Sequence, residues 1–231
     1  MSPLHLGTIL AAGLLILVPA PPAVALDGEA FAVENCAACH NLTGPATSTF
    51  RGVLERKAPE LFYAGSKFKR DWLVGWLQGP TIIRSSGVMF LNNIVNEDYK
   101  DRIREGSVTP CPVKLSNGEA EAVTDYLMTL KDHTMAANVV DLEQDLRERK
   151  AFRLFAKQLP CIGCHQIKLG KRELGGISGP DLRTAGQRLN PDWIYARIEN
   201  PQYWDPKTWM PRVEMSHRKR EMLTLFLTFM E

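Results

Sequence analysis

The stretch Cys161-Ile162-Gly163-Cys164-His165 decides how this chain is expected to fold, and Cys36-Ala37-Ala38-Cys39-His40 repeats its pattern. In each run two residues separate the cysteines, and a histidine directly follows the second cysteine. Two thiols one helical turn apart can form thioethers to the same edge of one porphyrin, and the histidine then lies under the ring as an iron ligand. The two runs therefore predict two covalently bound haem c groups.

Other kinds of site also use a C-x-x-C pair. A thioredoxin-like redox pair needs a βαβ setting, and a structural zinc site would combine both pairs. Neither needs a histidine directly after the second cysteine, so His40 and His165 favour haem. A fifth cysteine, Cys111, lies outside both motifs. Three roles are open for Cys111: a buried free thiol, an iron ligand or one half of an intermolecular disulfide.

The composition limits the class of protein. A chain of 231 residues can form one large or two small domains. The net charge of +2 argues against nucleic acid as a partner, because nucleic-acid binding proteins usually carry a concentrated basic surface. A hydrophobic content of 45% suits packed cores and is too low for a membrane protein with several spans.

Residues 1–25 have the pattern of a signal peptide. The apolar run from Leu4 to Val18 is followed by prolines and by Ala23-Val24-Ala25, which predicts cleavage after Ala25. The run is shorter than the roughly 20 residues of a membrane-spanning helix. No Lys or Arg precedes it, so an uncleaved anchor that keeps the protein associated with a membrane is the alternative. In either case the rest of the chain is predicted to be exported, to the periplasm or another extracytoplasmic compartment.

The second half of the chain repeats part of the first at a constant offset of 121 residues. Residues 58–61 (Ala-Pro-Glu-Leu) correspond to 179–182 (Gly-Pro-Asp-Leu), and Met89 corresponds to Met210. Eight residues are identical over 32 ungapped positions. The pattern indicates an internal duplication.

Apolar residues recur with helical period, and no strong alternating run is present. The helices expected from this pattern cover residues 27–35, 71–79, 116–130, 142–157, 192–200 and 216–230. The Thr-, Ser- and Gly-rich residues 41–57 are expected to form a loop, and residues 90–112 an inserted lobe without counterpart in the second half. These observations predict an all-α fold.

The order of these features resembles the class I cytochrome c family, twice in tandem. The shared features are an opening helix, C-x-x-C-H, a Gly-Pro-Asp-Leu segment, a helix bearing a tryptophan, a loop ending in methionine and a terminal helix. The resemblance covers residues 27–131 and 142–231, joined by a linker at 132–141. It is weaker in the first half, which has a longer loop and the extra lobe. It implies two helical cytochrome c-like domains, each wrapped around a covalent haem.

The resemblance also implies the iron ligands. His40 and His165 would be the proximal ligands, and Met89 and Met210 the distal ones. The carbonyl groups of the two prolines at the repeat position would accept the other ring N–H of each histidine; these prolines are Pro59 and Pro180. Only Met210 is followed by a proline, as in many such domains. The alternative ligands are Met135, His133 and Cys111 at the first haem and Met215 and His217 at the second.

A chain of this family would transfer single electrons and would not be an enzyme. Its partners would be redox proteins of a respiratory chain, with a membrane complex among the candidates, and an uncleaved leader would be its only membrane contact. The alternative is a dihaem enzyme of peroxidase or thiosulfate-oxidising type. A peroxidase needs an iron with one coordination position that can become free. A thiosulfate-oxidising enzyme needs a cysteine as an iron ligand, and only Cys111 could supply it.

Overall fold

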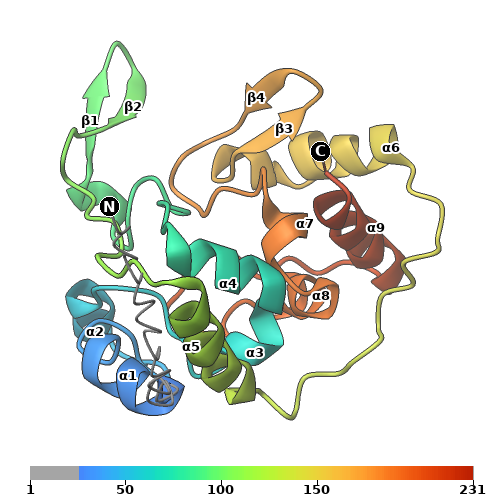
Figure 1. Cartoon of the computed structure of the whole chain (residues 1–231). Coiled ribbons are helices and arrows are strands. Elements are labelled where there is room, and N and C mark those ends of the chain that lie inside the picture. Colours follow the sequence, from blue (N-terminus) through green and yellow to red (C-terminus); the bar gives the residue numbers. More distant parts are fainter. Residues whose placement is uncertain (1–25, 231) are drawn as a thin grey trace, which may run out of the picture.

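The structure, a computed structural model, describes residues 26–230, so the predicted leader lies outside the described part of the chain. Figure 1 shows the elements along the chain. The α-helices are α1 Gly28–Asn35, α2 Phe50–Glu55, α3 Ala64–Lys67, α4 Arg70–Gln78, α5 Asn117–Thr129, α6 Glu148–Arg153, α7 Ala185–Arg188, α8 Pro191–Glu199 and α9 His217–Thr228. The strands are β1 Ile94–Glu97, β2 Lys100–Ile103, β3 Ile167–Leu169 and β4 Arg172–Leu174. Short 3₁₀ or π turns occupy Phe90–Asn92, Leu154–Gln158 and Pro160–Gly163.

The prediction of an all-α fold is wrong, because two small antiparallel sheets accompany the helices. β1 pairs with β2 inside the lobe at 90–112, and β3 pairs with β4 just after the second C-x-x-C-H run. Each strand has only three or four residues, which is too short for an alternating pattern to be visible in the sequence. Tight turns form both hairpins, with positive φ at Asp98 and Tyr99 in one and at Gly170 in the other.

The first half is built on the crossing of α1 and α5. Asp27 caps α1 by accepting the N–H groups of Glu29 and Ala30, at 3.0 and 3.1 Å, and a capping box begins α5 at Ser116. α4 packs on the other side of α5, as Figure 1 shows. The buried residues at the centre of this half are Ala32, Leu42, Ala64, Leu73, Leu77, Leu115, Ala120, Val123 and Leu127.

The second half packs α6, α7 and α8 against the C-terminal helix α9. The helical period of the apolar residues over 216–230 predicts one apolar side for this helix. The structure confirms it, since Leu223, Phe226 and Leu227 are at most 5% exposed. Tyr63 of the first half belongs to this second core, where its ring packs against Trp193 and Trp204 with centroids 6.5 and 6.0 Å away. The two halves therefore share apolar contacts as well as a chain connection.

The duplication is visible in the helices. α3 and α7 have the same bounds at the offset of 121 residues, and so do α4 and α8. The tryptophan helices begin one residue earlier than expected, at Arg70 and Pro191, and each ends two residues before a proline, Pro80 or Pro201. Two other predictions were wrong. Residues 41–57 were expected to form a loop, but they contain α2. The helix expected over 142–157 begins only at Glu148.

The two halves meet through equivalent residues. Phe68 forms an isolated antiparallel bridge with Leu189, its counterpart in the repeat. On either side, the Asn190 amide donates to the Lys67 carbonyl at 2.9 Å and the Lys69 amide donates to the Arg188 carbonyl at 3.0 Å. Reciprocal bonds between equivalent positions define an approximate two-fold axis through this bridge. α3 touches α8 and α4 touches α7, as such an axis requires.

The segment after α5 follows the second half. The Asn138 and Val139 amides donate to the Asp192 carboxylate at 2.7 and 3.0 Å, and the Asp141 amide donates to Glu221. The predicted linker is thus tied to α8 and α9. Within residues 26–230 no helix is both long and apolar enough to cross a membrane.

Substituting Gly28→Ala is expected to destabilise the protein, because a Cβ at Gly28 would lie 2.0 Å from the Ala122 carbonyl oxygen of α5. Overpacking of this kind costs about 1–3 kcal/mol. Gly75→Ala is the matched control: a Cβ there meets nothing within 4 Å, and alanine in an exposed helix gains up to about 1 kcal/mol. Thermal unfolding would measure both variants. Equal shifts in melting temperature would contradict the close α1–α5 crossing.

Candidate functional site

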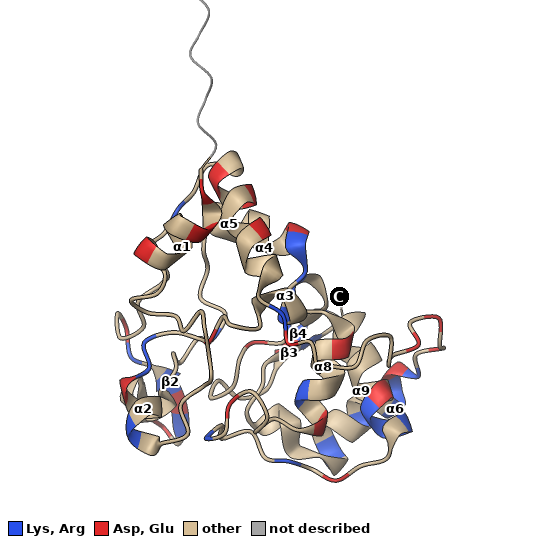
Figure 2. Cartoon of the chain, turned by 90° about the horizontal axis from the view of Figure 1, so that it is seen from below, with Lys and Arg blue, Asp and Glu red and all other residues tan. Residues whose placement is uncertain are grey.

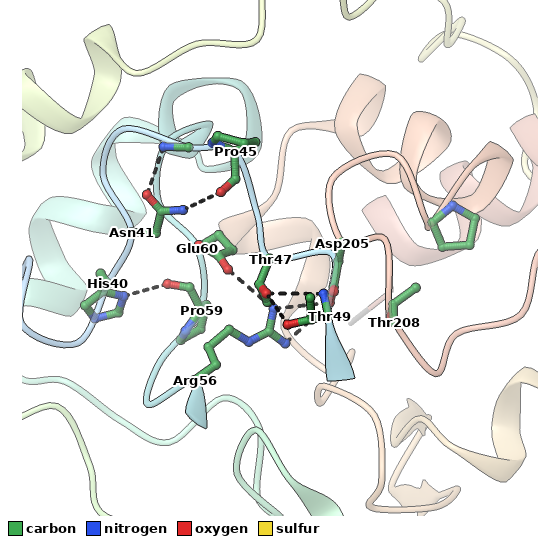
Figure 3. A network of polar contacts seen from close by, with 12 residues as sticks. His40, Asn41, Pro45, Thr47, Thr49, Arg56, Pro59, Glu60, Asp205 and Thr208 are labelled. Atoms are coloured by element: carbon green, nitrogen blue, oxygen red, sulfur yellow. Dashed lines mark hydrogen bonds and ion pairs between the residues drawn. The ribbon is translucent and has the colours of Figure 1, made fainter. Parts of the chain in front are cut away.

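Each C-x-x-C-H histidine is held by the carbonyl of a proline from the repeat. His40 Nδ1 lies 2.7 Å from the Pro59 carbonyl oxygen, and His165 Nδ1 lies 2.8 Å from that of Pro180. A carbonyl can only accept, so Nδ1 is the protonated nitrogen in both rings. The Nε2 lone pair is therefore left available for a metal. Figure 3 shows the first of these contacts.

Burial lowers the pKa of both histidines. For His40 burial is the main cause, the bond to Pro59 opposes it, and the charge of Lys67 adds to the lowering. For His165 burial is again first, with the bond to Pro180 opposing and positive charges nearby, including Arg84, adding to the effect. Both imidazoles are thus held neutral, which is the form that ligates iron.

The four motif cysteines are free thiols and are half-buried or exposed. Burial raises the pKa of Cys36 and of Cys161. Cys36 and Cys39 flank the turn after α1, where the His40 amide donates to the Cys36 carbonyl at 2.8 Å. The equivalent bond in the second motif, from His165 to Cys161, is 3.1 Å. In each half the turn therefore presents the two thiols and the imidazole from one short segment.

Tight packing of glycines fixes the second motif. A Cβ at Gly175 would lie 2.0 Å from the His165 carbonyl oxygen, and one at Gly176 would lie 2.0 Å from the Gly163 carbonyl oxygen. A Cβ at Gly179 would lie 2.6 Å from the His165 ring. The first half has alanine, Ala58, at the position of Gly179. The proximal side of the second motif is thus the more closely packed.

Met89 and Met210 differ from the other methionines of the described chain. Met128 packs against the core of the first half, and Met135, Met215, Met222 and Met230 pack against the core of the second. Of the methionines in residues 26–230, these two alone are absent from both cores, and both are half-buried. Their carbonyl groups accept from Asn93 at 3.0 Å and from Gln202 at 2.9 Å. The usual role of methionine as a flexible core residue therefore does not account for them.

Three of the alternative ligands are engaged elsewhere in the structure. His217 Nδ1 contacts the Tyr195 hydroxyl at 2.7 Å, and Met135 and Met215 pack against the second core. Cys111 is half-buried, and after burial its charge is the next cause that raises the pKa of the Cys36 thiol. An open cavity of about 310 Å³ lies beside the first motif, lined by Cys39, Asn41, Pro45, Thr47, Gly52, Glu55, Arg56, Ala58 and Glu60.

The side chains of the two motifs can be compared with the ligands that a bare metal ion and a haem each need. Among residues 26–230, no cluster of three or more His, Cys, Asp or Glu side chains could hold a metal ion. Each half instead offers a pair of thiols, a neutral imidazole with a free Nε2 and a methionine outside the core. Cysteine thiols, a histidine and a methionine are the residue types that would hold a covalently attached haem.

Comparison of the chain with protein-family models, curated proteins and solved structures found no match. Any assignment of function therefore rests on the residues and geometry of the two motifs. The structure also brings together basic side chains at the junction of the halves that the sequence patterns did not single out: Arg56, Lys67, Arg84, Arg188 and Arg197. The repeat could have revealed two of them, because Lys67 and Arg188 are cations at equivalent positions.

Proposed function

We propose that the chain is an exported dihaem c-type cytochrome that passes single electrons between redox partners. The observation that carries this proposal is the repeated unit in which a C-x-x-C-H histidine donates Nδ1–H to a proline carbonyl. Haem, once bound, supplies the one-electron chemistry. Covalent attachment would use Cys36 and Cys39 in the first half and Cys161 and Cys164 in the second.

The protein's own residues would hold and tune each haem. The Pro59 and Pro180 carbonyls orient the imidazoles of His40 and His165 and raise their basicity. Met89 and Met210 would be the other iron ligands, and an iron held by both a histidine and a methionine would have no position for a substrate and a higher reduction potential. Ligation of this kind favours an electron carrier, free or as a subunit of a respiratory complex, over an enzyme.

Exposed basic residues of the second half suit an acidic partner. Figure 2 shows Lys and Arg on α6 and α9. Lys168, Lys171, Arg172, Arg218 and Lys219 are exposed. Arg220 is not one of these exposed cations: it is 9% exposed and donates to Tyr195 and Glu199 at 2.8 Å. The exposed cations lie at both ends of α9, since Lys168 contacts Met230 beyond its last turn while Arg218 and Lys219 are in its first turn. Electrostatic attraction to either group would speed the encounter with an acidic redox protein.

A second candidate function rests on Cys111. Cys111 is a half-buried thiol outside both attachment motifs, and after burial its charge is the next cause that raises the pKa of the Cys36 thiol. A thiosulfate-oxidising type of dihaem enzyme would use such a sulfur as an iron ligand. In that case Cys111 rather than Met89 would ligate the first haem, and the protein would be a catalyst.

Mass spectrometry of the mature protein after acid–acetone extraction tests the main proposal. We expect the polypeptide to retain two haem masses, because thioether bonds survive a treatment that removes haem held only by its axial ligands. Cys36→Ala with Cys39→Ala should lose one haem mass, and Cys161→Ala with Cys164→Ala should lose the other. Cys111→Ala is the control and should retain both. Extraction of either haem from the unaltered protein would refute the proposal.

A further inference from the structure

The hairpin formed by β1 and β2 stands away from both cores. It projects beyond the helices in Figure 1, and every residue from Asn96 to Arg102 is exposed. The β3–β4 hairpin is different, because Ile167 is 0% exposed and belongs to the second core. A two-stranded hairpin is at best marginally stable when nothing packs on it. Packing within residues 26–230 therefore gives no reason for the exposed part of the β1–β2 hairpin.

The tip of this hairpin is strained. Asp98 and Tyr99 join the two strands and have φ values of 51° and 60°. A two-residue turn with positive φ at both positions prefers glycine at the second one, because a bulky side chain is unfavourable there. Tyr99 occupies that position, yet its side chain is fully exposed and no contact within the described chain holds it. Strain kept at an exposed aromatic residue points to a role in binding.

The base of the hairpin, in contrast, is firmly held. The Asn93 side-chain amide donates to the carbonyl groups of Ser86 and Met89, both at 3.0 Å. The Asn93 carbonyl accepts from the Arg104 amide at 2.8 Å. Ser86 is buried and donates in turn to the Ile177 carbonyl of the second half at 2.6 Å. The hairpin is thus a fixed projection whose base is bonded to the segment that carries Met89.

The charges at the tip indicate which kind of partner fits. Three carboxylates and two cations lie there: Glu97, Asp98, Lys100, Asp101 and Arg102. Arg102 pairs with Glu97 at 3.3 Å, which leaves an excess of negative charge beside Tyr99. Lipid surfaces attract exposed aromatic residues that are accompanied by cations, so this tip does not suit a membrane. Tyrosine is a frequent anchor in protein interfaces, where its ring fills a well-packed pocket.

We propose that the β1–β2 hairpin is a docking arm for a protein redox partner, and that Tyr99 enters an apolar pocket bordered by basic residues on that partner. This inference rests on the proposed function, in which Met89 ligates the first haem. Because the base of the arm is bonded to the Met89 carbonyl, a partner held on the arm is brought to the first haem. Leu91, which is 67% exposed in the turn after Met89, would add apolar contact near the base. The second half has no counterpart of this lobe after Met210, so the arm makes the two centres unequal toward the partner.

Tyr99→Gly in the full-length haem-loaded protein tests the docking arm. The probes are the membrane and periplasmic fractions of the source organism, which hold its electron donors and acceptors, and dithionite, which needs no docking. We expect the rate constant for reduction or reoxidation by one of these fractions to fall at least about tenfold, the effect of removing an interface anchor. Reduction by dithionite should be unchanged. The melting temperature should not fall, because glycine suits this turn.

Two further variants separate the contribution of the ring from that of the charge. Tyr99→Phe is the matched control and should keep most of the rate, since filling an apolar pocket depends on the ring. Asp98→Asn should lower the rate at low salt and have little effect at high salt, because salt screens the attraction between exposed charges. Equal losses in Tyr99→Phe and Tyr99→Gly, or no effect of Asp98→Asn, would contradict the chemistry assigned to the partner and overturn the inference.

Three other results would also overturn it. The first is unchanged rates with both fractions in Tyr99→Gly. The second is a lower melting temperature in that variant, which would give Tyr99 a structural role. The third is binding of the unaltered protein, but not of Tyr99→Gly, to vesicles of phosphatidylglycerol, which would assign the tip to a membrane.

Mass spectrometry separates these results from failure of the proposed function. A protein without covalent haem fails at that earlier step. A protein with two covalent haems and unchanged rates in Tyr99→Gly refutes the docking arm alone.

Discussion

Met210→Ala is expected to open one of the two haems to an external ligand. The reduced variant should bind carbon monoxide at one centre, and the midpoint potential of that centre should fall, because methionine ligation raises the potential. Axial ligands set haem potentials over a range of about 0.8 V, so the change should be large compared with that caused by a surface substitution. Optical titration with carbon monoxide and potentiometry would measure both effects.

Met222→Ala is the matched control, since Met222 lies on α9 against the second core. Met222 is only partly buried there, so the change should lower stability by about 0.5–3 kcal/mol, the usual range for a point substitution, and leave carbon monoxide binding unchanged. Met89→Ala should open the other centre. If Met89→Ala had no effect while Cys111→Ala altered one spectrum, Cys111 would be the ligand of the first haem. The enzymatic function would then replace electron transfer.

Gly179→Ala is expected to disrupt the second attachment site and leave the first intact. The added Cβ would lie 2.6 Å from Cε1 and 2.7 Å from Nδ1 of His165, the nitrogen that donates to Pro180. The Gly179 amide also donates to the Cys164 carbonyl at 2.7 Å, so the backbone cannot move away without losing that bond. We expect a loss of about 1–3 kcal/mol in stability and a lower yield of covalent haem in the second half.

The reverse change in the first half, Ala58→Gly, is the control for this variant. Ala58 already carries a Cβ while His40 keeps its 2.7 Å contact with Pro59, so the first site does not depend on glycine. Haem content of the separated halves after proteolysis, together with thermal unfolding, would distinguish the variants. Normal haem content and normal stability in Gly179→Ala would show that the close approach to His165 is absent in solution.

The features that sequence reasoning found are those that local chemistry determines. The helices expected over 71–79, 116–130 and 192–200 depend on residues a few positions apart, such as Ser116 and Glu119, which form the capping box that begins α5. The repeat also related residues that are far apart in sequence. Its common offset pairs Pro59 with Pro180, and each of these prolines accepts a hydrogen bond from the histidine of its own half.

Other features depend on contacts that no local pattern encodes. The hairpins were missed because strands of three or four residues carry no measurable period. The contact of Arg84 with Ser178 was missed because the two residues are 94 positions apart in sequence, and a single arginine in a loop is ordinarily solvated. Only the packing of the halves brings them together.

The bridge between Phe68 and Leu189 bears on how the two halves could have come together. Contacts between equivalent residues around a two-fold axis are those that two separate copies of one half would make as a dimer. Joining the copies in one chain makes their encounter intramolecular, so the interface no longer depends on protein concentration. Each copy is then free to change, one gaining a hairpin after Met89 and the other a glycine beside its histidine, while the pair stays together.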